Sequence, residues 1–505
     1  MRSYIKYILF GLLMSFSFTS CSDFLDEKPY SELTNENLGI DNTTDSVKYT
    51  TATQAEQLIT AAYGDFASEF WQLDMYIMND AQSDNAYAGE DKDQTRQIDE
   101  LRLLASNGTA SRDWGYLYRH IAKANTILNW VPQISDPVLA ESRKNEILGE
   151  ASFMRAISYF NLVRIYGSVP LIVKDIPEIN IGNIDEVYPL IYPKQSSVAD
   201  VYLQIISDLE FAQANVPEYS ANKFKISKAF VNLILAQVYA TKDGFVDTNW
   251  TKVKEYAEAV VNDTRYDLMP NYNDLFSVAS LPDNGVLPHL NLDNENCKES
   301  IFEVDYNSWT TLGNWAGQMF FGIDWKKFNT PSIDLYNSFA AADSIRRNAS
   351  IIFYNMTGKW TDAYWSSANY PFCWKIRAQE SNNIILYRLP EAILLLAEAE
   401  NQLGNITESQ KLVNRVRTRA GLANTTATTK DALQLAIENE NRFEFAFEGK
   451  RWFDLKRRNR FIEVMKNSRD HQKNYAASMQ EYQLLWPIPQ SEMQLNSNLI
   501  QNEGY

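Results

Sequence analysis

Residues 141–166 read ESRKNEILGEASFMRAISYFNLVRIY and form the most strongly patterned stretch of the chain. Apolar side chains recur there at helical spacings of three and four, as at Ile147, Ala151 and Met154. Further apolar residues occupy the other sides, so a helix over this stretch must be packed from several directions. Gly167 is typical of a helix end. The stretch therefore predicts a central helix in a large, mainly helical body.

Similar helical segments recur on both sides of this stretch. The periodicity predicts further helices over residues 53–69, 114–130, 198–214, 227–240, 250–261, 384–403, 408–420 and 430–448. Several carry alanines on one face, such as Ala392 and Ala399, where two helix axes can approach closely. We therefore expect a mainly α fold, a superhelix of divergent, tetratricopeptide-like helix pairs without the strict repeat consensus. An ordinary, non-repetitive helical domain is the alternative.

Residues 265–383 interrupt the helical pattern. This stretch is rich in Pro, Gly, Asn and Asp, and half of the 12 tryptophans of the chain lie within it. Residues 300–306 alternate as a short strand does. We expect a loop-rich, aromatic insertion with minor β structure.

The N-terminus has the layout of a bacterial lipoprotein signal. Basic residues 1–6 precede an apolar run over residues 7–18, and Cys21 follows shortly after. The run is too short for a stable membrane span, so we expect cleavage before Cys21 and acylation of that residue. An uncleaved anchor helix or a plain secretory signal is the alternative. The predicted organisation is a signal peptide over 1–20, an extended lead over 21–50, and a single helical domain over 51–505.

Charge and cysteine content exclude some classes of function. The formal net charge of −17 makes nucleic acid an unfavourable ligand, because phosphates would be repelled. With Cys21 acylated, Cys297 and Cys373 remain, and their separation matches no zinc or redox motif. One disulfide between them is compatible with the sequence, but two separate thiols are favoured.

The aromatic insertion is the first candidate for a binding surface. The apolar C–H face of a sugar ring lies flat on Trp or Tyr, and its hydroxyls bind polar side chains at the rim. Tyr306, Trp309, Trp315 and Trp365 are the candidate ligand residues here. Packing of these rings beneath long loops is the alternative.

A second candidate is the polar segment that follows the predicted helix 53–69. Asp80, Asp84 and Asn85 offer hydrogen-bonding groups and Tyr87 offers an aromatic face. Their oxygens could also hold Ca²⁺, although the spacing of an EF-hand is not met, and we expect no cofactor. Asx-turn chemistry in a loop is the alternative.

Signals of catalysis are weak. The three histidines are far apart, and the sequence has no metalloprotease, nucleophile-elbow or P-loop motif. Residues 442–457, RFEFAFEGKRWFDLKR, combine charges with large aromatic rings. We interpret them as a helix, a break at Gly449 and a second helical turn, stabilised by ion pairs along a helix face. We therefore do not expect an enzyme.

Seven further short motifs, together with residues 442–457, carry a family resemblance. They are residues 21–29 (CSDFLDEKP), 149–156 (GEASFMRA), 166–170 (YGSVP), 387–392 (YRLPEA), 396–399 (LAEA), 485–490 (LWPIPQ) and 498–502 (NLIQN). In this order they span essentially the whole chain, which closely resembles the SusD/RagB family of Bacteroidetes outer-membrane lipoproteins.

The resemblance implies a function as well as a tetratricopeptide-like fold. It implies a lipid-anchored protein of the cell surface that binds oligosaccharides and acts as a lid on a SusC-like, TonB-dependent outer-membrane transporter. Binding of peptides or another nutrient is the alternative, and a glycoside hydrolase is less favoured. Family ligand residues come from the loop after the first helix and from the aromatic insertion. Those regions correspond by position to residues 80–87 and 306–315.

Overall fold

The protein is described here by a computed structural model. It describes residues 49–89, 93–174, 184–241, 248–276, 295–306, 319–320, 326–376, 383–468 and 477–505. The predictions for Cys21, Trp309 and Trp315 lie outside these residues, as do those for the signal peptide and most of the lead. Within the described ranges, no helix is long and apolar enough to cross a membrane.

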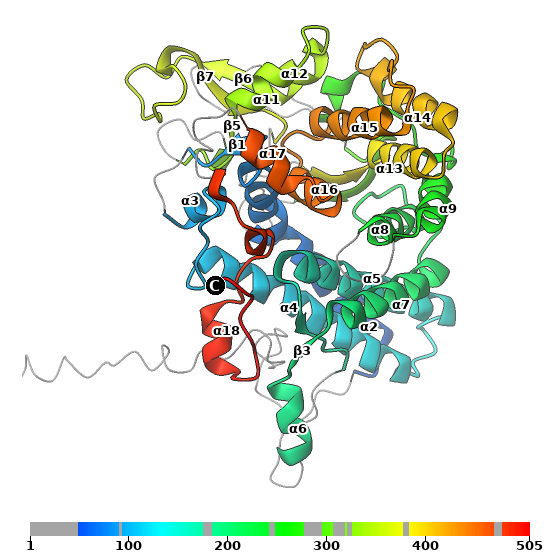
Figure 1. The fold of residues 1–505 in the computed structure, drawn as a ribbon. Coiled ribbons are helices and arrows are strands. Elements are labelled where there is room, and N and C mark those ends of the chain that lie inside the picture. The colour runs from blue at the N-terminus through cyan, green and yellow to red at the C-terminus, as the bar shows by residue number, and fades with distance from the viewer. Residues whose placement is uncertain are drawn as a thin grey trace, which may run out of the picture.

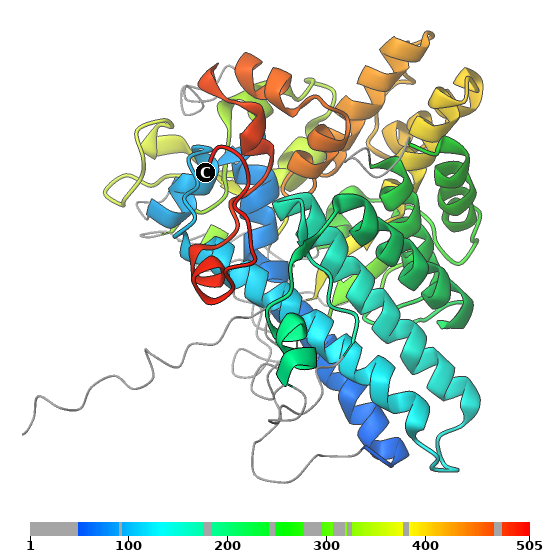
Figure 2. The ribbon, with the colours of Figure 1, turned by 60° about the horizontal axis from the view of Figure 1, so that its bottom comes forward.

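A stack of helices forms the body of the protein (Figures 1 and 2). Its members, each packed against the next, are α4 (Gly108–Trp130), α5 (Glu141–Tyr166), α7 (Val198–Asn215), α8 (Lys228–Ala240), α9 (Trp250–Val261), α13 (Leu389–Gln402), α14 (Ile406–Arg419) and α15 (Lys430–Glu444). Helix α2 (Ala52–Tyr63) packs against α4 and α5. The mainly α, tetratricopeptide-like prediction is confirmed.

Helix α5 shows why these residues specify the stack. From Ile147 onward its side chains are buried on almost every side, between α4 and α7, as the sequence predicts. The chain then turns at Gly167 with φ +74°, a conformation that favours glycine. The alanines predicted to allow close packing, Ala392 and Ala399, are fully buried in α13.

Four of the predicted helices have clearly different bounds in the structure. The helix predicted over 430–448 ends at Glu444, and the helix predicted over 114–130 begins earlier, at Gly108. The segment 53–69 ends as an α-helix at Tyr63 and continues as the 3-10 turn η2 (Gly64–Ala67). The segment 384–403 begins as the strand β8 (Ile384–Arg388), and α13 starts only at Leu389. Pro390, in the first turn of α13, lacks an N–H and is best tolerated there, so the helix cannot extend back through it.

The insertion leaves the stack after α9 and returns to it at α13, and these two helices pack against each other. Its elements are short: η6 (Tyr272–Phe276), β4 (Ser300–Val304), β5 (Thr330–Pro331), α11 (Ile333–Ser338), α12 (Ser344–Ser350), β6 (Ile351–Tyr354), η8 (Ser367–Asn369) and β7 (Tyr370–Cys373). Strand β4 pairs with β8, and β6 pairs with β7, both antiparallel.

Two π-helical turns, η3 (Phe70–Asp74) and η4 (Ile77–Ala81), follow η2. They lead into β1 (Ala86–Tyr87), which pairs with β5 of the insertion, and then to α3 (Asp93–Asp99). The other elements are η5 (Val131–Gln133), β2 (Val169–Pro170), α6 (Ile184–Ile191), β3 (Gln195–Ser196), α16 (Arg451–Arg457), α17 (Phe461–Asn467), η10 (Glu481–Leu484) and α18 (Gln490–Leu495).

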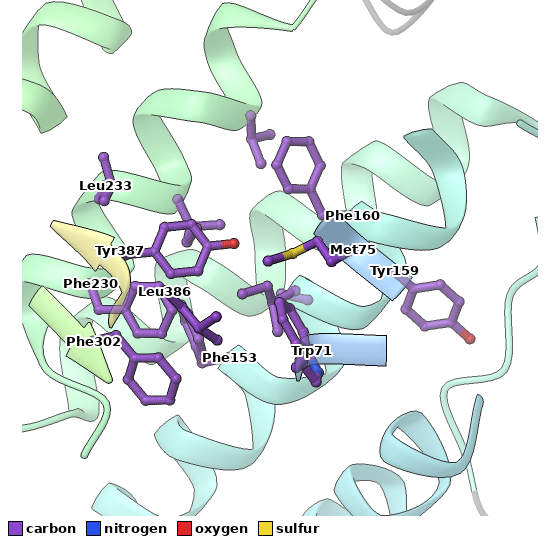
Figure 3. Packing of buried hydrophobic residues seen from close by; sticks show 14 of the residues in the cluster. Trp71, Met75, Phe153, Tyr159, Phe160, Phe230, Leu233, Phe302, Leu386 and Tyr387 are labelled. Carbon is purple, nitrogen blue, oxygen red and sulfur yellow. The ribbon is translucent and has the colours of Figure 1, made fainter. Parts of the chain in front are cut away.

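One large apolar core joins the stack to the insertion (Figure 3). The ring of Phe230 on α8 stacks on Phe302 of β4, with centroids 4.5 Å apart, and is tilted against Phe153 of α5 at the same distance. The cluster includes residues from Ala55 near the start of the described chain to Leu499 near its end. Strand β4 is therefore held on the stack by aromatic packing.

Candidate ligand-binding face

The segment 80–87 lies beneath the insertion and is buried. Its carbonyls receive hydrogen bonds from Ser332: Ser332 N donates to Asn85 O at 3.0 Å, and Ser332 Oγ donates to Asp84 O at 2.8 Å. The structure thus brings together the two regions that the sequence nominates as ligand-binding.

The carboxylate of Asp84 forms ion pairs with two guanidinium groups. Arg451 donates to both of its carboxylate oxygens, at 2.8 and 3.0 Å, and Arg442 approaches to 3.0 Å. Burial by itself would raise the pKa of Asp84, but the two positive charges outweigh burial and hold that pKa well below its usual range. Asp84 is therefore ionised. Its ion pairs connect the segment after η4 to α15 through Arg442 and to α16 through Arg451.

Asp80 and Asn85 also have protein partners. Gly449 N donates to Asp80 Oδ2 at 2.8 Å, and Arg442 Nε donates to Asn85 Oδ1 at 3.1 Å. Burial raises the pKa of Asp80 to about 7. Within the described ranges no group of three or more His, Cys, Asp or Glu is placed to hold a metal ion.

The ion pairs that the sequence predicts along a helix face in residues 442–457 form only in part: Asp454 pairs with Arg457 at 2.6 Å on α16. Helix α15 ends, the chain breaks at Gly449 with φ +67°, and α16 begins, as predicted. However, Glu444 binds Arg388, Arg419 and Arg346, which lie far from it in the sequence. Because Arg346 belongs to α12, this buried cluster ties the insertion to the stack.

Tyr87 fixes a surface loop of the insertion. Its hydroxyl donates to Asp362 Oδ2 at 2.9 Å, and the hydroxyl of Tyr370 donates to the same oxygen. The other carboxylate oxygen accepts a hydrogen bond from Tyr364 N at 2.9 Å. A Cβ on Gly89 would lie 2.8 Å from Thr330 Oγ1 and 2.9 Å from Asp362 Oδ2, so a larger residue there would displace this anchor.

Trp360 and Tyr364 are the exposed aromatic residues of this loop, with 39% and 47% of their surface accessible. The edge of the Tyr364 ring meets the Tyr87 ring, with centroids 5.4 Å apart. The Lys327 ammonium lies 4.7 Å from the centroid of the Trp360 ring. We call these two residues, with Asp362 between them, the Trp360–Tyr364 platform.

Charged groups of α3 and its C-terminal end border this platform. Asp99 and Arg96 lie close enough to Tyr364 to influence the pKa of its hydroxyl, which burial raises. Arg96 is paired with Glu100 at 2.9 Å. An exposed pair of rings with carboxylate and guanidinium groups beside it is suited to the apolar faces and hydroxyls of a sugar.

The remaining candidates lie below the surface or outside the described residues. Trp365 is half-buried, and its Nε1 donates to Pro331 O at 3.1 Å. Tyr306 is buried in the main core. Trp309 and Trp315 fall outside the described residues. The sequence does not single out the platform, because composition identifies only the whole insertion as rich in aromatic residues. Which of its rings are exposed depends on contacts between distant residues, such as that of Asp362 with Tyr87.

Both thiols are separate, as favoured from the sequence. Cys297 is half-buried and Cys373 is buried, and both are free. Burial raises the pKa of Cys297 to about 11 and that of Cys373 to about 12. Both sulfurs are therefore protonated and unreactive near neutral pH.

The structure is thus that of a helical-repeat protein, a tetratricopeptide-like stack that carries a loop-rich face with exposed rings. Residues 319–505 match the model described as the SusD family, and residues 23–240 match the model described as "Starch-binding associating with outer membrane". The chain belongs to the SusD/RagB family.

Several relatives match over nearly the whole chain. SusD-like protein P2 of Formosa agariphila is 26% identical over 99% of this chain and 100% of its own. A SusD-like protein of Bacteroides ovatus is 26% identical over 87% of this chain and 80% of its own. Among solved structures, a laminarin-binding SusD-like protein aligns with a TM-score of 0.71 at 22% identity, covering 90% of this chain and 100% of that one. Surface glycan-binding protein A from Bacteroides uniformis gives 0.73 at 21%, covering 90% and 99%. At these identities the structures establish the shared fold.

Proposed function

We propose that this protein is a glycan-binding lipoprotein of the outer-membrane surface, which captures oligosaccharides and passes them to a SusC-like, TonB-dependent transporter. The observation that carries the proposal is the Trp360–Tyr364 platform, two exposed rings on a loop anchored by Asp362. The family supports it through its description as starch-binding and associated with the outer membrane. Solved relatives that are named for binding laminarin or surface glycans support it further.

The platform binds sugar by stacking and by hydrogen bonding at its border. The rings of Trp360 and Tyr364 remove the C–H faces of sugar units from water, and the polar groups of Arg96 and Glu100 receive their hydroxyls. The ligand is neutral under this proposal, so the acidic surface of the protein does not repel it. The reaction class is binding alone, without catalysis.

The residues nominated from the sequence take two roles in this proposal. The buried side chains of Asp80, Asp84, Asn85 and Tyr87 support the binding face from below, as does Trp365. Trp309 and Trp315 are proposed as further ligand contacts from the same insertion. Cys21 carries the acyl chains that keep the protein beside its transporter, and the lead over residues 21–50 links it to the body.

The first experiment presents the protein lacking residues 1–21 to a glycan array and then to calorimetry. Trp360→Ala and Tyr364→Ala are each expected to weaken binding of the identified glycan by about 5- to 10-fold, the value of one aromatic contact of roughly 1 kcal/mol. Tyr188→Ala is the matched control, because Tyr188 is an exposed tyrosine on α6, at the opposite end of the molecule (Figure 1).

Three other outcomes of these experiments would contradict the proposed function or its site. Retention of peptides from a protein digest, with no glycan bound, would replace the sugar by a peptide cargo. Turnover of an oligosaccharide, abolished by one carboxylate substitution, would replace binding by hydrolysis. Unchanged glycan affinity in both platform variants would remove the platform as the site.

A further inference from the structure

A cavity of about 90 Å³ lies where α5, α8, α13, α15 and α16 converge, and no residue of the Trp360–Tyr364 platform lines it. One water needs roughly 10–15 Å³ of such space, so the cavity can hold a small molecule. Its wall combines charged side chains with the aromatic rings of Phe160, Tyr387, Phe445 and Phe453. Nothing in the binding described above uses this cavity.

The charged side chains around the cavity are engaged with one another or with the backbone. Lys450 donates to Leu386 O at 2.7 Å and lies 3.3 Å from Glu391. Arg457 is bonded to Asp454 at 2.6 Å. A charged ligand would therefore have to displace one of these buried pairs, which is unfavourable.

Arg164, which also lines the cavity, is likewise held in place. Its guanidinium lies 3.8 Å from the ring centroids of both Phe160 and Phe453, and its side chain donates to Phe160 O at 3.0 Å. These contacts present hydrocarbon and ring surface to the cavity alongside the paired charges.

Neutral polar groups supply the remaining hydrogen-bonding capacity. Figure 3 shows the Tyr387 hydroxyl directed toward Met75, and both residues line the cavity. Burial raises the pKa of Tyr387, so its hydroxyl keeps a proton to donate. Gln237 and Asn441 each donate one amide N–H, to Glu391 and to the backbone of Ile437, which leaves the second N–H and the amide oxygen of each side chain for a ligand.

We infer that this cavity binds a neutral, hydroxylated molecule no larger than one sugar ring, a monosaccharide or a small polyol. Its hydroxyls donate to the amide oxygens of Gln237 and Asn441 and exchange a hydrogen bond with Tyr387. Its C–H surface packs on the aromatic wall. This is a second site, separate from the platform, and it does not depend on the proposed function of the platform.

Calorimetry and crystal soaks with D-glucose, D-galactose and glycerol test the inference on the protein lacking residues 1–21. We expect at least one of these probes to bind with a dissociation constant on the order of 1 mM and to appear in the cavity. Tyr387→Phe should weaken it about 5-fold, the effect of one lost hydrogen bond. Tyr159→Phe is the matched control, because the Tyr159 hydroxyl points away from Met75 and accepts from Ile172 N (Figure 3).

The two sites are distinguished by their variants. Trp360→Ala should leave probe binding in the cavity unchanged even if it abolishes binding of the larger glycan. Only water in the cavity after all three soaks would overturn the inference, as would preferential binding of acetate or L-alanine. Equal affinity of the wild type and Tyr387→Phe would overturn the placement of the ligand.

Discussion

Glu444→Gln tests whether the buried ion cluster holds the insertion on the helical stack. Glu444 is fully buried and accepts hydrogen bonds from Arg388, Arg419 and Arg346, the last with 3.3 Å between Arg346 Nη1 and Glu444 Oε2. The substitution preserves shape but leaves three guanidinium groups with one fewer negative charge. Removing one partner of a buried pair typically costs about 3–5 kcal/mol of unfolding free energy.

Urea denaturation measures that loss. The control is Glu408→Gln, because Glu408 forms an exposed pair with Lys411 at 2.8 Å, and such pairs contribute about 1 kcal/mol or less. If Glu444→Gln costs no more than Glu408→Gln, the buried cluster does not stabilise the insertion, and our interpretation of residues 442–457 is wrong.

The pH dependence of the unfolding free energy is a second test of Glu444→Gln. Burial by itself would raise the pKa of Glu444, but Arg419, Arg388 and Arg346 outweigh burial and hold it well below the ordinary value of 4.5. A carboxyl with a lowered folded pKa stabilises the fold fully above its unfolded pKa. This stabilisation is lost as the pH falls toward the folded value. The difference in stability between wild type and Glu444→Gln should therefore be largest above about pH 4.5 and should narrow in more acidic solution.

Two further outcomes are expected from the site and the thiols. Tyr87→Phe removes the hydrogen bond to Asp362 and should lower the free energy of unfolding by about 1 kcal/mol. The loop that carries Trp360 should then be cleaved faster in limited proteolysis. An unchanged cleavage rate would mean that the hydrogen bond from Tyr370 is enough to anchor the loop. Cys297 and Cys373 should react with a thiol reagent at pH 8 only when urea unfolds the protein, because burial raises the pKa of both thiols. Rapid labelling of the folded protein would contradict these raised pKa values.

Local pattern was sufficient for most of the stack. Helix α5 ends at Tyr166, as periodicity and Gly167 predict, because neighbouring residues in the sequence determine both. The apolar run 384–403 misleads the same reasoning, since Ile384–Arg388 pairs with β4, which is distant in sequence. A buried strand and a buried helix have the same apolar composition, and only the partner decides between them.

Burial and exposure at the candidate site depend even more on contacts between residues that are distant in the sequence. Residues 80–87 have the polar composition of an exposed loop, yet Arg442 and Arg451 from near the end of the chain neutralise Asp84 and allow its burial. Helical spacing predicts the pair of Asp454 with Arg457, but it cannot predict the distant partners of Glu444 and Arg451. Conversely, the exposure of Trp360 follows from where Asp362 anchors its loop, which no local pattern encodes.

The chain leaves the stack at α9 and returns to it at α13. This arrangement determines how the insertion can change in length and sequence. Because these two helices pack directly against each other, the residues between them begin and finish at neighbouring points of an already continuous stack. A segment attached in this way can be lengthened, shortened or exchanged without altering the register of the helices on either side. Chimeras that keep β4, β8 and the partners of Glu444 while replacing the loop around Trp360 should therefore retain the body and acquire a different selectivity.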